Sequence, residues 1–265
     1  MAWYPGARKR DLGKNTSQLT ADDLVLQLHT MVGNLTGTDN YFRTVGTFSH
    51  FGIGGTWGAD ARSGLDGVVY QWGDTARRAA ASLNGNRRTI SIETADNAAL
   101  PIQPWTDKQC DAIVSLMVWA NQIHGIPLEL IPDSKPGRRG VAYHRLGIDP
   151  WRVPDGELWS SSAGKLCPGD ARISQIPALI DRARGIVAGP PVQEDLSIMD
   201  PDTQKYLDGK FAQLSQAFNI TIYGDERVDT RPDTHPYNLQ SLSAKVDALQ
   251  ASVDALKQPP PPPAA

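Results

Sequence analysis

The sequence predicts an α/β fold in which short apolar strands alternate with amphipathic helices. Short segments rich in apolar and β-branched residues recur between turn signals, and residues 24–30 and 89–94 are the clearest of them. Residues 106–124 and 174–187 instead place apolar side chains at helical spacing. A chain of 265 residues, 40% of them hydrophobic, can bury the core that such a fold needs.

Charge and composition limit the partners of the chain. The net charge of −3 argues against nucleic-acid binding, because such proteins usually carry a basic face. The sequence has no apolar run of membrane-spanning length and no signal-peptide pattern at its start, so we expect no membrane partner. Cys110 and Cys167 are the only cysteines, which excludes a disulfide framework but leaves a single bridge between them open.

The first half of the chain is expected to supply most of the strands. Residues 1–21 hold several basic and polar side chains and are expected to form an irregular, solvated arm. The glycine-rich stretch 54–67 is expected to be a loop, and Asp66-Gly67 is typical of a hairpin turn. No phosphate-binding glycine motif opens a helix there. The expected elements are strands at 24–30, 48–53, 68–72 and 89–94, a turn at 31–37 and a short helix at 38–43.

The second half is expected to contain two long helices. Thr106 and Gln109 have the spacing of a capping box, and Gly125 is expected to end the first helix. Cys110 lies on the apolar face of that helix and is expected to be a core residue. Ser174 is expected to cap the second helix. Short strands are expected at 128–131 and 141–144.

The composition becomes more polar after Gly189-Pro190-Pro191, which is the best predicted domain boundary. Residues 190–236 are expected to be a linker with one short helix around 204–218. Residues 237–258 contain a short heptad pattern, which predicts either a helix packed on the domain or self-association into a dimer or trimer. Residues 259–265 form a proline-rich tail that is expected to be disordered. The heptad positions are Leu239, Leu242, Val246, Leu249, Val253 and Leu256.

Groups capable of zinc chemistry follow the predicted strands. His29 and Glu93 lie at the ends of two strands, His144 follows a third, and Cys167 stands two residues after Lys165. Two histidines and a thiolate would leave a fourth zinc position for water, which is the arrangement of a catalytic site. A carboxylate could take the proton of that water and a lysine could stabilise an oxyanion. The alternative is that each residue is separately a core histidine, an inert thiol or an ion-pair partner.

The order of these residues resembles the type-2 N-acetylmuramoyl-L-alanine amidase family, whose fold is shared with peptidoglycan recognition proteins. The resemblance covers residues 22–187 and is closer to the amidase domains of endolysins from phages of mycobacteria and related actinobacteria. The matching segments are His29-Thr30, Ser49-His50-Phe51-Gly52-Ile53, Asp66-Gly67-Val68-Val69-Tyr70-Gln71, Ile90-Ser91-Ile92-Glu93 and Lys165-Leu166-Cys167-Pro168-Gly169.

The resemblance implies a central mixed β-sheet flanked by helices, in a zinc amidase domain at 22–189. It implies one zinc ion per chain, held by His29, His144 and Cys167. It also implies hydrolysis of the amide between the lactyl group of N-acetylmuramic acid and L-alanine of the stem peptide. Glu93 falls on the position of the catalytic acid of part of the family. Lys165 falls on that of the assisting lysine of other members.

Two positions depart from the family pattern. Ser49 stands where some members have a tyrosine before the histidine, so Glu93 carries more of the expected catalysis. Tyr143-His144-Arg145 stands where many members have Gly-His. His50 is expected to be structural or to hydrogen-bond near the site. The aromatic residues expected either to line the substrate groove or to cover edges of the core are Trp57, Trp151 and Trp159.

The leading functional prediction is a zinc amidase that degrades bacterial peptidoglycan as a phage or prophage endolysin. Such a protein is expected to be made in the host cytoplasm without a signal peptide and to reach the wall after another protein permeabilises the membrane. The alternatives are a non-catalytic peptidoglycan-binding module and a zinc peptidase that cuts within the stem peptide. Fold likeness does not decide which amide is cleaved. Self-association would add avidity for a polymeric wall.

Overall fold

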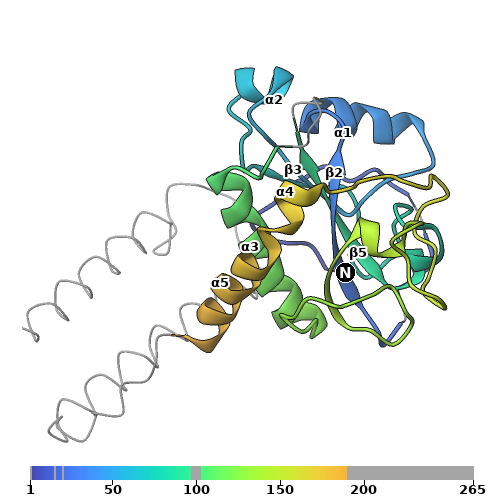
Figure 1. The fold of residues 1–265 in the computed structure, drawn as a ribbon. Coiled ribbons are helices and arrows are strands. Elements are labelled where there is room, and N and C mark those ends of the chain that lie inside the picture. The colour runs from blue at the N-terminus through green and yellow to red at the C-terminus, as the bar shows by residue number, and fades with distance from the viewer. Residues whose placement is uncertain (1, 15, 20, 97–102, 190–265) are drawn as a thin grey trace, which may run out of the picture. The chain divides into compact units, whose positions relative to one another are not determined.

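A six-stranded mixed sheet forms the centre of the structure, a computed structural model that describes residues 2–14, 16–19, 21–96 and 103–189 (Figure 1). The strands follow the order β1-β4-β3-β5-β2-β6, and all neighbours are parallel except β3 and β4. The α/β fold with a mixed sheet is therefore confirmed. The strands are β1 (Arg8–Lys9), β2 (Val25–Met31), β3 (Phe51–Ile53), β4 (Val69–Gln71), β5 (Thr89–Ala95) and β6 (Gly140–Tyr143).

The central strands β2 and β5 separate an apolar face of the sheet from a polar one. Successive side chains of a strand point to opposite faces. Leu26 and Leu28 of β2 pack with Ile90 and Ile92 of β5 in the main core cluster, together with side chains of the long helices. The residues between them, such as Gln27 and Ser91, are polar and equally buried on the other face.

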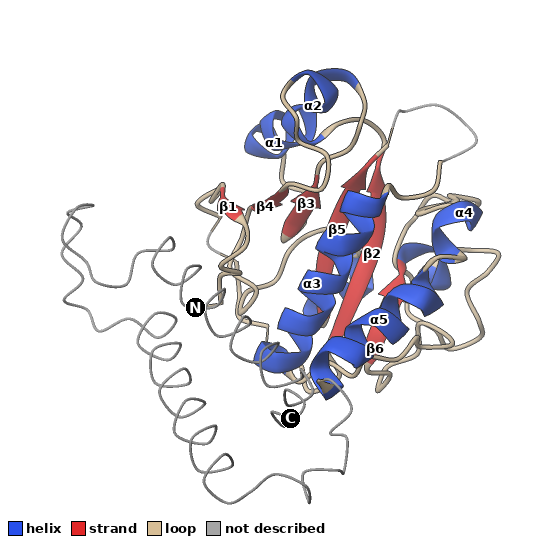
Figure 2. Ribbon diagram, turned by 90° about the vertical axis from the view of Figure 1, so that its left-hand side faces the viewer, coloured by secondary structure: helices blue, strands red, loops and turns tan. Residues whose placement is uncertain are grey.

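The long helices α3 (Asp107–His124) and α5 (Ile176–Ala188) lie across one face of the sheet (Figure 2). Thr106 and Gln109 form the predicted capping box of α3, and Gly125 ends that helix in the left-handed conformation. Buried α3 residues such as Ile113 and Met117 fill the core on this side. The remaining helices are α1 (Leu35–Thr44), α2 (Gly58–Arg62), α4 (Asp170–Ile173) and the 3-10 turns η1 (Leu83–Arg87) and η2 (His144–Gly147).

The described part of the N-terminal segment is packed on the sheet and is not irregular throughout, although its basic residues Arg8, Lys9 and Arg10 are exposed as expected. Residues 8 and 9 pair with β4 as an edge strand. Tyr4 packs edge-on against Trp119, with ring centroids 5.6 Å apart. Arg10 forms an ion pair with the buried Asp39, at 2.6 Å between Nη2 and Oδ2. Apolar side chains before and after the basic residues, namely those of Ala2, Tyr4, Ala7 and Leu19, anchor this segment to the core.

Four local predictions also differ from the structure. Residues 128–131 form no strand and only one bridge, Leu130 to Val141, because prolines on both sides limit pairing. Residues 54–67 contain the short helix α2, whose Asp60 carboxylate accepts the Leu35 backbone N–H. That cap helps α1 to begin at Leu35 instead of residue 38. Ser174 follows α4 and does not cap α5 through its side chain.

The predictions for 190–236, 237–258 and 259–265, including the domain boundary after Gly189, lie outside the described residues. Among the described residues, none of the helices is both long and apolar enough to cross a membrane.

Candidate functional site

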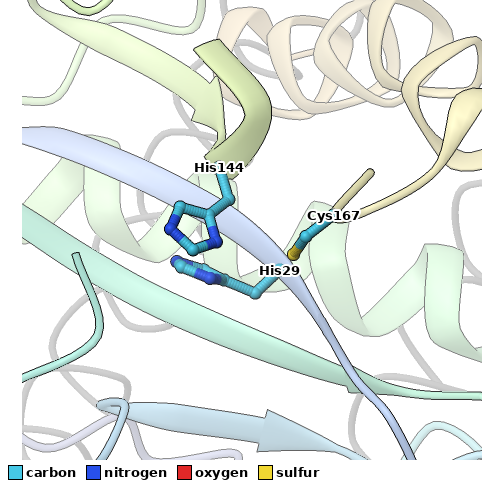
Figure 3. A group of neighbouring side chains, drawn as sticks. All are labelled: His29, His144 and Cys167. Atoms are coloured by element: carbon cyan, nitrogen blue, oxygen red, sulfur yellow. The ribbon is translucent and has the colours of Figure 1, made fainter. Parts of the chain in front are cut away.

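His29, His144 and Cys167 converge at one point of the fold (Figure 3). One potential ligand atom from each residue lies within 4.8 Å of the other two, and all three side chains are buried. The two imidazole rings are 4.3 Å apart between centroids. Segments that are far apart in the sequence therefore meet in a group able to hold a metal ion. The predicted ligand set is brought together, while its occupation by zinc stays a prediction.

Strand register explains why the two histidines meet. In the parallel pair of β2 and β5, His29 lies opposite Glu93. On the other side, β6 pairs with β2 as far as Tyr143 opposite Leu28, so His144 follows beside His29. The carboxyl ends of parallel strands lie at one edge of the sheet, which is where ligands bind in open α/β sheets.

Two backbone contacts hold Cys167 at this edge. The Arg145 N–H donates to the Cys167 carbonyl at 2.9 Å, which ties the cysteine loop to the residue after His144. The Thr30 N–H donates to Cys167 Sγ at 3.2 Å. The sulfur is thus fixed beside the strand that carries His29.

Hydrogen bonds on the far side of each imidazole orient both rings. His29 Nε2 lies 2.9 Å from Gln27 Oε1, which also accepts from Ser82 Oγ. His144 Nε2 lies 3.0 Å from the Trp159 carbonyl oxygen. Because these oxygens only accept, each Nε2 carries the proton and each Nδ1 offers a lone pair. His144 Nδ1 is buried without a hydrogen-bond partner among the described residues.

The electrostatics of the three groups are set mainly by burial. Burial lowers the pKa of His144 to about 4 and that of His29 well below its usual value, so both rings are neutral at pH 7. Burial, reinforced by Glu93, raises the pKa of Cys167 to about 12. Metal binding at this thiol would therefore release a proton.

Glu93 and Lys165 flank the three ligand candidates. Glu93 Oε1 lies 3.7 Å from His29 Nδ1 and accepts a hydrogen bond from Ser49 Oγ at 3.4 Å. Burial raises the pKa of Glu93 to about 7, and the Lys165 charge opposes that rise. Lys165 is exposed, and its ammonium also lowers the pKa of both histidines. Both predicted catalytic residues therefore lie within electrostatic range of the site.

The interpretation of Trp159 as a groove-lining residue is wrong. Its side chain is 1% exposed and packs where Gly85 and Gly147 leave room for the indole. Trp159 is instead a core aromatic, as the alternative expected. Its backbone carbonyl contributes to the site by accepting the hydrogen bond of His144 Nε2. Trp57 and Trp151 are exposed, and Trp151 lies 5.1 Å from the Arg145 guanidinium. Their part in substrate binding stays a prediction.

His50 is structural. Its Nε2 contacts the Arg77 carbonyl at 2.8 Å, and its Nδ1 accepts the Ser91 N–H at 3.0 Å. Sequence reasoning missed the residues that support the site, namely Gln27, Thr30, Ser82, Thr94 and Arg172. The available signal was a polar residue two positions before His29 in an otherwise apolar strand, because period-two alternation places Gln27 and His29 on the same face.

A family model described as Amidase_2, N-acetylmuramoyl-L-alanine amidase, matches residues 23–170 of the chain. The comparison of the chain with curated proteins finds no match. Among solved structures, the chain is similar to the Staphylococcus aureus hydrolase AmiA, with 14% identity and a TM-score of 0.49 over 71% of this chain and 87% of that one.

Two further solved structures show similarity at comparably low identity. The endolysin amidase LysCS from Clostridium intestinale has 14% identity and a TM-score of 0.41, over 68% of this chain and 99% of that one. The Drosophila peptidoglycan recognition protein SD has 13% identity and a TM-score of 0.41, over 64% and 93%.

Proposed function

The chain belongs to the N-acetylmuramoyl-L-alanine amidase family described by the matching model, and from this premise we propose that it is an active, zinc-dependent peptidoglycan amidase. It would hydrolyse the amide between N-acetylmuramic acid and L-alanine of the stem peptide. The observation that supports this most directly is the convergence of His29, His144 and Cys167, with Glu93 beside them.

The three side chains fit zinc by the chemistry of their donors. Imidazole nitrogen and thiolate sulfur are ligands that zinc prefers, and three protein ligands leave a position for water or substrate. Each histidine uses Nε2 for an oxygen acceptor, the arrangement that commonly orients metal-bound imidazoles. The buried, unpartnered Nδ1 of His144 is the donor atom that a metal ion would use.

The neighbouring residues supply the proton transfers. A bound zinc ion would lower the pKa of water and polarise the substrate carbonyl. The Glu93 carboxylate faces the ligand atoms and, with a pKa of about 7, can accept a proton and return it near neutral pH. Lys165 brings positive charge towards the oxygen that becomes negative as water adds to the amide.

Zinc content and product release, measured on one sample, test the proposal. Wild type is expected to hold one zinc per chain and to release stem peptides with a free L-alanine amino group, identified by mass spectrometry. Cys167→Ala should do neither. Cys110→Ala is the matched control, because Cys110 is the other buried free cysteine and lies in α3.

The other outcomes identify the alternatives. Wild type that binds muropeptides but cleaves nothing, with or without added zinc, would make the chain a recognition module. Peptide fragments that lack the L-alanine end would indicate a stem peptidase instead.

We also propose that the protein acts as an endolysin, reaching the wall from the cytoplasm after the membrane is permeabilised. The support is the motif resemblance to phage endolysin amidases. Bacterial cells that produce wild type should lyse only when a membrane-permeabilising agent is added, and cells that produce Cys167→Ala should not lyse. Lysis without the agent would contradict this route.

A further proposal concerns self-association through residues 239–256, and it rests on the heptad pattern of the sequence. Light scattering at micromolar concentration should give a dimer or trimer that is lost when 236–258 are deleted. A monomeric full-length chain would refute it.

A further inference from the structure

The peptide group between His29 and Thr30 is held at both of its polar atoms. Its carbonyl oxygen accepts a hydrogen bond from Thr94 Oγ1 at 2.6 Å. Its N–H donates to Cys167 Sγ at 3.2 Å. This one peptide group therefore links two of the three candidate ligands, and its orientation sets where the sulfur lies relative to the His29 ring.

Two threonine hydroxyls next to this peptide group share one partner, the guanidinium of Arg172. Arg172 Nη1 donates to Thr30 Oγ1 at 2.7 Å and to Thr94 Oγ1 at 2.8 Å. Thr94 Oγ1 donates a hydrogen bond to the His29 carbonyl oxygen, and Thr30 Oγ1 donates one to Asp96 Oδ2 at 2.6 Å. A hydroxyl that accepts from a fixed donor must point its proton elsewhere. Arg172 therefore directs the Thr30 hydroxyl, and it directs the Thr94 hydroxyl together with Trp105 Nε1, which donates to Thr94 Oγ1 at 2.9 Å.

Arg172 is itself rigidly placed. Its side chain is 1% exposed, Nε donates to the Gln103 carbonyl at 2.9 Å and Nη2 donates to the Ala95 carbonyl at 2.9 Å. Burial lowers the pKa of Arg172 to about 10, against the effect of Asp96, so the guanidinium is charged at neutral pH. The group is thus a fixed, charged donor to the two threonine hydroxyls beside this peptide group.

We propose that Arg172 is a positioning residue for the metal centre: through Thr30 and Thr94 it fixes the His29–Thr30 peptide group and hence the relative placement of His29 and Cys167. This inference rests on the proposed function, because it assigns Arg172 to the zinc site of the proposed amidase. Arg172 follows Cys167 by five positions, so the same short segment supplies the ligand and its support.

Metal affinity, measured apart from catalysis, tests the proposal. Zinc affinity of the full chain is obtained by equilibrium competition with a chelator, and the cobalt(II)-loaded protein reports the metal–sulfur contact through its thiolate absorption band. Arg172→Met and Thr30→Val should weaken zinc binding about 10- to 100-fold, as loss of a supporting partner does at metal sites, and alter the cobalt band. Thr30→Ser keeps the hydroxyl and should bind zinc like wild type.

A control for general destabilisation is Asp39→Asn, which disrupts the ion pairs of the buried Asp39 carboxylate with the partly exposed Arg10 and Arg43. It should lower the unfolding midpoint of the metal-free protein and leave zinc affinity unchanged. If Arg172→Met and Thr30→Val lose stability in the same way but retain wild-type zinc affinity and the wild-type cobalt band, Arg172 is only structural and the inference is overturned.

Two further outcomes distinguish failure of this inference from failure of the proposed function. If wild type binds neither zinc nor cobalt, the proposed function fails before any variant is compared. If Arg172→Met does not fold, the Thr30→Val and Thr30→Ser pair decides, because both changes are small and occur at the residue whose N–H contacts the sulfur.

Discussion

The two faces of the central strands differ in what holds them together. One face is covered by α3 and α5 (Figure 2). There Leu26, Leu28, Ile90 and Ile92 pack into the main apolar core. On the opposite face, Gln27 and Ser91 are polar and buried, and Gln27 forms a hydrogen bond with His29 while Ser91 forms one with His50. The apolar face gains stability from area removed from water, about 1.5–3 kcal/mol per large side chain. On the polar face, hydrogen bonds instead fix the positions of reactive groups such as His29 and Glu93.

Replacing His29 on the polar face should have the largest effect. His29→Ala removes a candidate ligand, so zinc content and amide hydrolysis should both fall to background. The loss of a buried imidazole should still leave a folded chain, checked by circular dichroism. A variant that keeps full activity would show that this face does not carry the chemistry.

Glu93→Gln separates the proton-transfer role from metal binding. The side chain keeps its size but loses its basicity, so we expect kcat to fall about 10²- to 10⁴-fold. Zinc content should remain at the wild-type level, because Glu93 is not among the three ligand candidates. Steady-state kinetics and metal analysis on one preparation check both statements, and an unchanged kcat would remove Glu93 from the mechanism.

Ile113→Ala tests the apolar face. Ile113 lies in α3 and is fully buried in the main core, so the variant should lose about 2–5 kcal/mol of unfolding free energy in a denaturant titration. Its zinc affinity should match wild type while it is folded. Loss of zinc binding in the folded variant would mean that the two faces are not independent.

Asp39 sharpens the comparison because it is buried and polar, and its carboxylate accepts hydrogen bonds from Arg10, Arg43 and Trp72, none of which is a ligand candidate. Burial raises its pKa, but hydrogen bonds from Arg10, Arg43 and Trp72 outweigh this and leave the pKa below its usual value. A depressed pKa contributes stability above the pKa of the unfolded chain, and this is lost as pH falls through the folded value.

Asp39→Asn should therefore cost about 1–3 kcal/mol at pH 7 and make the acid side of the stability–pH curve flatter than in wild type. Urea titrations between pH 7 and acid pH measure this. Parallel curves for the two proteins would show that Asp39 titrates alike in the folded and unfolded states.

The two faces also differ in how well the sequence predicts them. Periodicity identifies the core face of α3, and the capping box at Thr106 and Gly125 mark its ends. The ligand set could be predicted because the family motifs carry it. The support of the site could not, because the Trp159 carbonyl and the Arg172 bonds depend on contacts between segments distant in the chain.

The edge of the fold was predicted least well. The N-terminal segment has a polar composition, yet Tyr4 and its neighbours contribute apolar area to a core built from other segments. A pattern of local residues does not report a partner such as Trp119, which follows more than a hundred positions later.

The separation of Thr30 from Cys167, 137 positions along the chain, bears on when the site forms. Contacts between distant residues form late, since the chain entropy lost in closing so long a loop must be recovered from other interactions. A nascent polypeptide that has reached only β5 holds His29 and Glu93 but lacks the sulfur. We therefore expect the metal centre to assemble only after translation has passed Cys167, which follows β6, the last strand of the described sheet.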